Sequence, residues 1–252
     1  MNWPASLPEK RIVLIVQARM GATRLPGKPL LKVLNRPLLG YVWERVRRSK
    51  LTHSHILATT TNPDDDPIAL WAQKNEAPLY RGSEEDVLDR YYQAAKQHNA
   101  EVVVRITADC PLIDPHLIDQ ALVHFLTFYP RYDYVSNTLE RTYPRGLDVE
   151  VFSFKALEEA HTHATAPEER EHVTPYIYRH PEKYTLDQFK YPVDLSLYRW
   201  TVDTPEDLAL ITKIIEALYP THPTFAFIDM IELLDEHPDW SALNSHISQK
   251  KL

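Results

Sequence analysis

The segment from Arg11 to Pro29 constrains the fold of this chain more than any other. It reads RIVLIVQARMGATRLPGKP. Residues 12–16 form an unbroken aliphatic run, which is typical of a strand buried on both faces of a sheet. Residues 17–28 contain three cations, two glycines and no acid. A buried strand that leads into such a loop predicts an open α/β sheet with a ligand site at the carboxyl ends of its strands.

The loop has the chemistry of an anion site. Gly21 and Gly27 would let the backbone approach a ligand closely. Arg19, Arg24 and Lys28, together with free backbone N–H groups, would suit a polyphosphate. The alternative, which spacing leaves open, is a solvated basic loop without a ligand.

The rest of the chain first alternates between strand and helix patterns, and then changes. Strands are predicted at 12–16, 55–60, 78–80 and 101–107, and helices at 37–50, 64–74, 84–98 and 114–128. From Tyr132, strands are predicted at 133–136, 147–154, 184–189 and 198–202, and helices at 155–163, 168–180 and 204–218, with a helical tail in 221–252. The first half predicts a mostly parallel sheet with helices on both faces. We expect a single domain over 1–252 with a small insertion around 132–190.

The composition excludes several classes of protein. A net charge of −7 over 252 residues argues against a nucleic-acid partner, because binding to the phosphate backbone needs clustered excess cations. The single cysteine, Cys110, cannot form an internal disulfide and is expected to be a packing residue rather than a nucleophile. No apolar stretch approaches the ~20 residues of a membrane span, and the N-terminus lacks a signal-peptide pattern. We expect a cytoplasmic protein.

Acidic residues follow two of the predicted strands. Asp109 comes after the strand at 101–107, and Asp203 after the strand at 198–202. Carboxylates of this kind are ligands that Mg²⁺ prefers, together with phosphate oxygens and water. The alternative is that each caps the helix that follows it.

Two further segments of the chain have polar side chains on a predicted strand or next to it. Thr59 lies at the end of a predicted strand and could contact a base, or belong to a capping turn. On the predicted strand 147–154, Asp148 and Glu150 would share one face, so they could bind an acceptor or simply face water. Arg145, beside them, could meet a substrate carboxylate in a bidentate pair.

The basic loop resembles the nucleotide loop of sugar cytidylyltransferases, the enzymes that make CMP-Kdo and CMP-sialic acid. The matching motif is Ala18-Arg19-x-x-x-Thr23-Arg24-Leu25-Pro26-Gly27-Lys28. The longer form, with QARMG in front, is most similar to their spore-coat polysaccharide biosynthesis F branch. The resemblance covers most of residues 11–218. Sugar-1-phosphate nucleotidyltransferases and molybdenum-cofactor guanylyltransferases instead carry a Gly-Gly pair where this chain has Gln17-Ala18. Ala22 is a departure, since the family often has serine there.

Other sequence motifs support the resemblance to sugar cytidylyltransferases. TADCPL at 107–112 and WTVDTPED at 200–207 resemble the two metal-aspartate segments of the family, which implies Mg²⁺ at Asp109 and Asp203. Ala108 departs from the glycine of several relatives. EHVTP at 171–175 resembles a word of the spore-coat branch, which makes His172 a candidate acceptor contact. Arg81 resembles a nucleotide contact of relatives.

The resemblance implies a function and a fold. It implies transfer of CMP from CTP to an acidic sugar of the sialic acid, Kdo, legionaminic or pseudaminic kind, with release of pyrophosphate, in surface polysaccharide biosynthesis. It also implies a three-layer α/β/α nucleotide-diphospho-sugar transferase-like fold and a homodimer formed through 132–190. The alternatives are a non-sugar acceptor, another nucleotide, or a nucleotide-binding protein without catalysis. A glycosyltransferase is disfavoured because the segment at 108–111 lacks an Asp-x-Asp pair.

The implied site residues fall into three groups. Catalytic roles are expected for Arg19, Lys28, Asp109 and Asp203; nucleotide contacts for Ala18, Arg19, Gly21, Thr23, Arg24, Lys28, Thr59 and Arg81; and acceptor contacts for Arg145, Asp148, Glu150 and His172.

Overall fold

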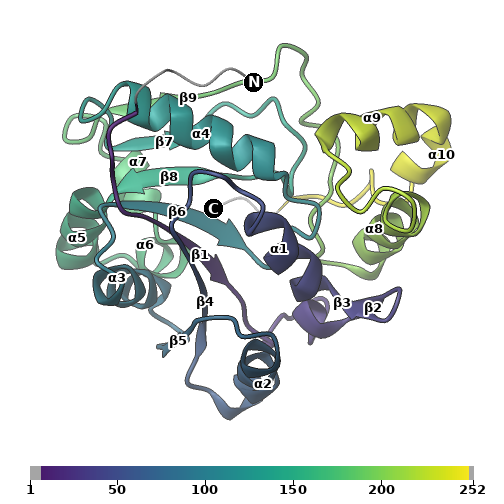
Figure 1. Ribbon diagram of the computed structural model, residues 1–252, viewed down its shortest axis with the longest axis horizontal. Helices are drawn as coiled ribbons and strands as arrows, with labels where there is room; N and C mark the ends of the chain where they lie inside the picture. Colours follow the sequence, from purple (N-terminus) through teal and green to yellow (C-terminus); the bar gives the residue numbers. More distant parts are fainter. Residues whose placement is uncertain (1–6, 250–252) are drawn as a thin grey trace.

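A mixed sheet forms the centre of the computed structural model, which describes residues 7–249. Within these residues its seven strands lie in the order β5-β4-β1-β6-β8-β7-β9 (Figure 1). Their bounds are β1 Ile12–Gln17, β4 Ser54–Thr60, β5 Leu79–Gly82, β6 Val102–Thr107, β7 Tyr134–Ser136, β8 Glu150–Ser153 and β9 Leu186–Gln188. β8 runs antiparallel to both of its neighbours, and the other pairs are parallel. The predicted mostly parallel α/β sheet is therefore confirmed.

Helices cover both faces of this sheet (Figure 1). Their bounds are α1 Leu38–Val46, α2 Asp66–Lys74, α3 Val87–Gln97, α4 Pro115–Thr127, α5 Phe154–His163, α6 Pro167–His172, α7 Pro175–Tyr178, α8 Pro205–Leu218, α9 Phe227–Glu236 and α10 Pro238–Ser241. One core lies under α1, α2, α4, α8 and α9, and the other under α3, α5 and α7. Short 3-10 helices at Lys28–Leu30 and Pro63–Asp65 (η1 and η2) and a ribbon of β2 Lys32–Val33 and β3 Arg36–Pro37 complete the fold.

The aliphatic run in β1 reflects burial on both faces. Leu14 and Val16 belong to the first core, whereas Val13 and Ile15 belong to the second, and all four have no exposed surface. Because successive side chains of a strand point to opposite faces, a central strand between two helical layers needs apolar residues at every position.

No helix within residues 7–249 is long and apolar enough to cross a bilayer.

Two helix starts follow from local capping. Thr204 and Asp207 form a capping box at the start of α8, followed by Pro205 in the first turn, as the sequence pattern predicts. For α3 the predicted start at residue 84 is wrong. Asp86 accepts the N–H of Asp89 at 2.8 Å, so α3 begins at Val87, three residues later than predicted.

The region after Tyr132 departs most from prediction, because side chains take over backbone hydrogen bonds there. The predicted strand 147–154 begins only at Glu150, since Asn137 bonds the carbonyl of Leu147 at 2.8 Å and the N–H of Val149 at 2.9 Å. The predicted strand 198–202 is a single bridge between Arg145 and Arg199.

The predicted helix 168–180 is in fact two helices, α6 and α7. They are separated at Val173, which has φ 73° and ψ −55°. The N–H of Thr174 donates to the carbonyl of His172 at 2.9 Å across this residue, which makes a tight three-residue turn. Pro175 then begins α7.

Candidate functional site

The site lies where β1 and β6 end. The segments that carry the two predicted metal aspartates are joined there by their backbones. The carbonyl of Asp109 accepts the N–H of Val202 at 2.8 Å and the hydroxyl of Thr201 at 3.2 Å. This contact brings Asp109 and Asp203 to the same edge of the sheet, although 94 residues (203 − 109) separate them in the chain.

Lys28 lies between the two carboxylates. Its Nζ is 3.0 Å from Asp109 Oδ2 and 2.7 Å from Asp203 Oδ1. Gly27, just before it, has φ 71°, a left-handed conformation that glycine adopts at little cost, and η1 begins directly afterwards. The glycine therefore turns the loop so that Lys28 points back toward the ends of the strands.

The three charges in this cluster support one another. Burial on its own would lower the pKa of Lys28, but the carboxylates of Asp109 and Asp203 outweigh it and raise the pKa above 10.5. Burial would likewise raise the pKa of Asp109, but Lys28 and a hydrogen bond from Thr107 outweigh it and lower the pKa below 3.8. Both groups are therefore charged at neutral pH.

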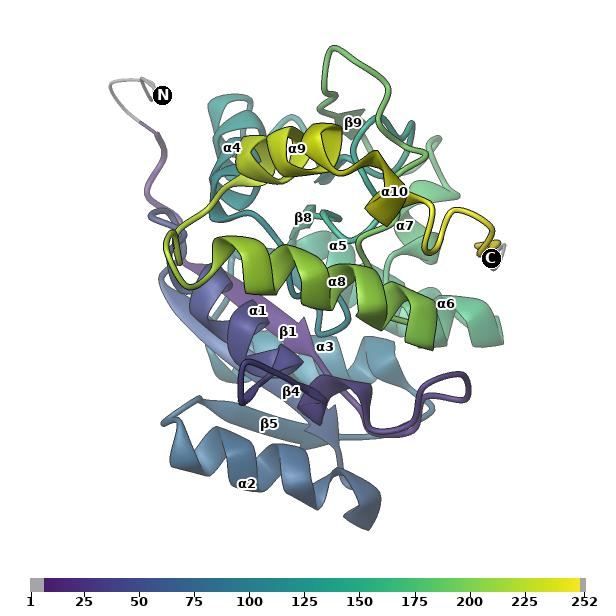
Figure 2. The same ribbon diagram turned by 90° about the vertical axis from the view of Figure 1, so that its right-hand side faces the viewer.

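The remaining cations of the basic loop are more exposed. Arg24 lies 3.2 Å from Asp203, whereas the ion pairs that Arg19 forms within residues 7–249 are longer, 4.0 Å to Glu84 and 3.7 Å to Glu171. Gly21 and Thr23 are also exposed. Figure 2 shows the loop, in dark purple, at the same end of the molecule as the start of α8. The loop thus presents cations and backbone groups beside the aspartates.

The donor set fits Mg²⁺ shared with a phosphate ligand. Two carboxylates already converge on one cation, the ammonium of Lys28. In the described part of the chain no cluster of three or more His, Cys, Asp or Glu residues could hold a metal ion unaided. Mg²⁺ is commonly held by one or two carboxylates plus substrate phosphates and water, so Asp109 and Asp203 match this mode of binding.

Three predicted nucleotide contacts also take part in hydrogen bonds within the protein. Thr59 is fully buried and its hydroxyl donates to the carbonyl of Ala18 at 2.9 Å, which ties the start of the loop to β4. The guanidinium of Arg81 donates to the carbonyls of Thr60 and Asn62 at 2.7 and 3.0 Å and pairs with Asp66. The side chains of Thr59 and Arg81 therefore stabilise the backbone at the start of the loop and after β4.

The predicted acceptor residues lie on two segments. Arg145 is held by its backbone, whose N–H donates to Tyr198 at 3.0 Å and whose carbonyl accepts from Trp200 at 2.7 Å. Gly146, with φ 100°, allows this approach, because a Cβ there would lie 2.5 Å from the Trp200 backbone. Burial, and secondly the nearby charge of Arg141, lowers the pKa of Arg145.

Asp148 and His172 have different surroundings. Asp148 forms a bidentate pair with Arg141, at 2.5 and 2.8 Å, and keeps part of its side chain exposed. His172 ends α6, directly after Glu171, which faces Arg19 of the basic loop. Burial lowers the pKa of His172 below 6.5, so its imidazole is neutral at neutral pH.

Glu150 is buried in a polar cluster of its own. Its carboxylate accepts hydrogen bonds from Tyr134 at 2.7 Å and Thr174 at 2.6 Å, and pairs with Arg105. Only 5 % of Glu150 is exposed. Asp148 precedes β8, whereas Glu150 begins it, so the expected pair on one strand face is replaced by two acids with separate partners.

This difference predicts that the two acids respond differently to substitution. Glu150→Gln should lower the free energy of unfolding by about 3–5 kcal/mol, because it leaves the buried Arg105 without its counter-ion. Asp148→Asn, the matched control, should cost under about 1 kcal/mol, because its pair with Arg141 is partly exposed. Urea unfolding of both variants measures this. Equal stability of the two would contradict the structural role of Glu150.

Cys110 is a packing residue, as predicted from its isolation in the sequence. It is 4 % exposed, and burial and then the charge of Asp109 raise the pKa of its thiol well above 9.0. A thiol that resists ionisation is a poor nucleophile. It instead donates to Asp109 Oδ1 at 3.5 Å, beside the hydroxyl of Thr107, which also donates to that oxygen.

No sequence pattern predicted the groups that hold the Asp203 carboxylate. Arg199 donates to Asp203 Oδ2 at 2.7 Å and to both oxygens of Asp207, at 2.9 and 3.1 Å. Asn244, from the C-terminal segment, completes this cluster. The motif WTVDTPED contains Asp207, but its pattern indicates only an acid in the first turn of a helix. No pattern indicated a role for Arg199 or Asn244.

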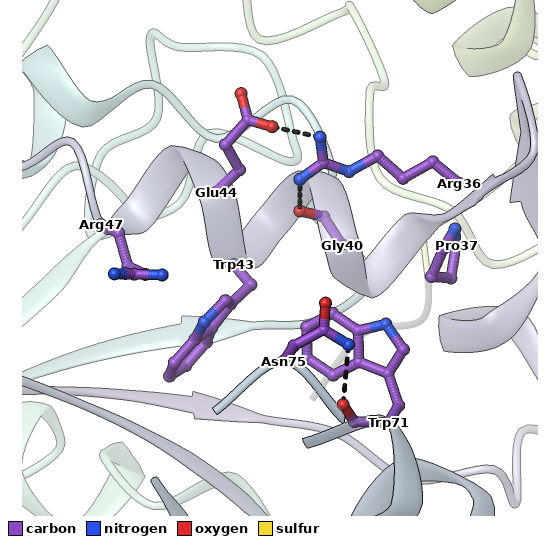
Figure 3. Close-up of a pocket in the computed structure, with 8 residues that line it drawn as sticks. All are labelled: Arg36, Pro37, Gly40, Trp43, Glu44, Arg47, Trp71 and Asn75. Atoms are coloured by element: carbon purple, nitrogen blue, oxygen red, sulfur yellow. Dashed lines mark hydrogen bonds and ion pairs between the residues drawn. The ribbon is translucent and has the colours of Figure 1, made fainter. Parts of the chain in front are cut away.

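A cavity of about 230 Å³ lies elsewhere, between α1 and α2 (Figure 3). Trp43 and Trp71 line it, together with the ion pair of Arg36 and Glu44. None of the predicted site residues is among those that line it. The candidate site at the strand ends is therefore separate from this cavity.

A mostly parallel α/β sheet with a basic loop after β1, and with two aspartates brought together beside that loop, is typical of a nucleotidyltransferase. The cytidylyltransferase family model matches residues 13–236. The chain belongs to this family. It is 34% identical over 238 residues to the Bacillus subtilis spore coat polysaccharide biosynthesis protein SpsF, covering 90% of this chain and 95% of that protein. The predicted resemblance and enzyme class are confirmed.

Solved structures agree with this assignment. A cytidylyltransferase from Leptospira borgpetersenii superposes with a TM-score of 0.88 at 34% identity, over 96% of this chain and 100% of that one. CMP:2-keto-3-deoxy-manno-octonic acid synthetase, solved with CTP, superposes with a TM-score of 0.66 at 18% identity, over 82% and 99%. The second likeness concerns the fold alone, which is the nucleotide-diphospho-sugar transferase-like fold that the resemblance implied.

Proposed function

We propose that the protein transfers CMP from CTP to an acidic sugar and releases pyrophosphate, as a step in surface polysaccharide biosynthesis. The observation that carries the proposal is the convergence of Lys28, Asp109 and Asp203 within 3.0 Å contacts at the ends of the strands. CTP is supported by family membership and by the structural neighbour that was solved with CTP. The polysaccharide context is supported by the similarity to SpsF.

The chain's own residues supply positioning and charge. Lys28, Arg19 and Arg24 bind the triphosphate, and Lys28 faces the charge that grows on the departing pyrophosphate. The acceptor hydroxyl forms a bond to the α-phosphorus as the bond to the bridging oxygen breaks, so the two reactants must be held in line. Asp109 and Asp203 would hold Mg²⁺, which when bound polarises the α-phosphate and neutralises charge.

The acceptor would lie beside Arg145. Arg145 has no ion-pair partner within residues 7–249, so it can meet a sugar carboxylate in a bidentate pair. Asp148 and neutral His172 offer hydrogen bonds to hydroxyl groups. Glu150 supports the acceptor residues indirectly, because its carboxylate accepts a hydrogen bond from Thr174, two residues after His172.

Pyrophosphate release tests the proposal most directly. The full-length protein is incubated with Mg²⁺, each of the four nucleoside triphosphates in turn, and a panel of acidic sugars that includes Kdo and sialic acid. We expect release only with CTP and an acidic sugar. Release with another triphosphate, or with a non-sugar acceptor only, would replace this proposal with the corresponding alternative. Binding of CTP without release for any acceptor would favour a nucleotide-binding protein without catalysis.

We further propose a homodimer formed through the insertion at 132–190. Leu139, within it, is 39% exposed, and Val193 and Leu197, in the loop that follows, are 59% and 94% exposed. Large apolar side chains at the surface are common at interfaces between subunits. Sedimentation equilibrium at micromolar concentration should give twice the mass of the chain. A monomer at these concentrations would contradict the proposal, and Leu197→Asp should weaken the dimer if the loop takes part.

A further inference from the structure

The C-terminal segment 237–249 reaches the groups that hold Asp203. Asn244 is only 2 % exposed, although it lies near the end of the chain. Its side-chain Nδ2 donates to the carbonyl of Arg199 at 2.8 Å and to Asp207 Oδ1 at 2.8 Å. Gln249, five residues further on, accepts a hydrogen bond from Arg199 Nη1. Figure 2 shows α8, α9 and α10 on the same side of the molecule.

Arg199 and Asp207 in turn set the direction of the Asp203 carboxylate. Asp203 Oδ2 accepts from Arg199 Nη2 at 2.7 Å, and the backbone N–H of Asp203 donates to Asp207 Oδ2 at 2.9 Å. One oxygen and the backbone are thereby fixed. The other oxygen, Oδ1, points to Lys28 Nζ at 2.7 Å, on the side of Asp109.

The surroundings of this cluster make Asn244 important for its geometry. Asp207 has no exposed surface and Arg199 is 5 % exposed, so a missing donor is not simply replaced by bulk water. A cavity of about 150 Å³ lies beside Arg199, lined also by Leu210 and Ser241. This space would let the Arg199 side chain shift once the amide is removed.

We propose that Asn244 is a positioning residue for the reaction, which acts through Asp207 and Arg199 on the Asp203 carboxylate. The C-terminal segment is then a working part of the metal and nucleotide site. The inference rests on the proposed function, because it takes Asp203 to be a metal ligand. Groups that hydrogen-bond and orient a ligating carboxylate typically change metal affinity by about 10–100-fold when they are removed.

The test measures Mn²⁺ binding by electron paramagnetic resonance on the full-length protein in the presence of CTP. Asn244→Ala should raise the Kd for Mn²⁺ by about 10-fold or more. Its affinity for CTP in the presence of EDTA should be unchanged, and high Mg²⁺ should restore kcat. Leu243→Ala is the matched control. Leu243 packs against the core from the same turn, so this variant should melt at a lower temperature but bind Mn²⁺ as the wild type does.

The outcomes separate the inference from the proposed function. If the wild type with CTP does not bind Mn²⁺, the proposed role of Asp203 fails. If the wild type binds Mn²⁺ and Asn244→Ala binds it equally well, the positioning role of Asn244 is overturned. The positioning role is also overturned if Leu243→Ala weakens Mn²⁺ binding as much as Asn244→Ala does. Should Asn244→Ala not fold, Asn244→Ser decides, since serine stays polar but is too short to make both hydrogen bonds of the Asn244 amide. A Kd raised about 10-fold supports the inference, and an unchanged Kd overturns it.

Discussion

Asp109→Asn and Asp203→Asn should each reduce kcat for CMP transfer by on the order of a thousandfold or more. A metal ion contributes several kcal/mol of charge stabilisation to phosphoryl chemistry, and about 4 kcal/mol corresponds to a thousandfold. The substitutions keep the shape of the side chain. In Asp109→Asn the amide oxygen would still accept from the hydroxyl of Thr107, and Lys28 would still pair with Asp203. We therefore expect little change in the melting temperature.

The measurement is pyrophosphate release as a function of Mg²⁺ concentration. Asp194→Asn is the matched control, because Asp194 is an exposed carboxylate in a loop. It accepts a hydrogen bond from the N–H of Ser196 at 2.9 Å. It should keep the wild-type rate at every Mg²⁺ concentration. If both site variants keep full activity at limiting Mg²⁺, the aspartates are capping residues of the following segments and not metal ligands.

Lys28→Ala should slow the reaction by about a hundred- to thousandfold. Removing one preorganised donor at a point where charge develops typically costs about 3–4 kcal/mol. In this structure Lys28 is the cation that faces both aspartates, and its ammonium is held charged by them. The Arg24 side chain is 37% exposed and, among the described residues, forms an ion pair with Asp203 but not with Asp109, so it is poorly placed to replace Lys28.

The control for this prediction comes from the same stretch of chain. Lys32 is exposed, in β2, so Lys32→Ala should leave turnover within about twofold of the wild type. Circular dichroism and thermal melting show whether Lys28→Ala is folded. A folded Lys28→Ala protein with near-normal turnover would contradict a role of this lysine in phosphate binding.

The two acids of the predicted acceptor face show why partners could not be read from spacing. The alternation in 147–154 does persist in the side of the sheet that each apolar residue faces, because Leu147, Val149 and Val151 belong to one core and Phe152 to the other. The pattern could not reveal that Asn137 takes the hydrogen bonds of residues 147 and 149, or that Arg105 lies opposite Glu150. These partners come from 10 to 45 residues away.

The sequence by itself determined the elements whose causes are local. The aliphatic run of β1 and the capping pattern at the start of α8 each act within a few residues, so their patterns predicted the strand and the helix. The alternation of strands and helices then placed the ends of β1 and β6 at one edge, because parallel strands end on the same side of a sheet.

The tertiary structure decided which charges meet. Lys28 contacts Asp109 and Asp203 across 81 and 175 residues, and Asn244 contacts Arg199 across 45. Thr59 and Arg81 have the residue types of ligand contacts, yet they bond to backbone carbonyls around the loop. The physical reason is that period and capping are set by neighbours in the chain. The partner of a charged side chain is instead set by packing between distant segments, where burial makes a missing counter-charge costly.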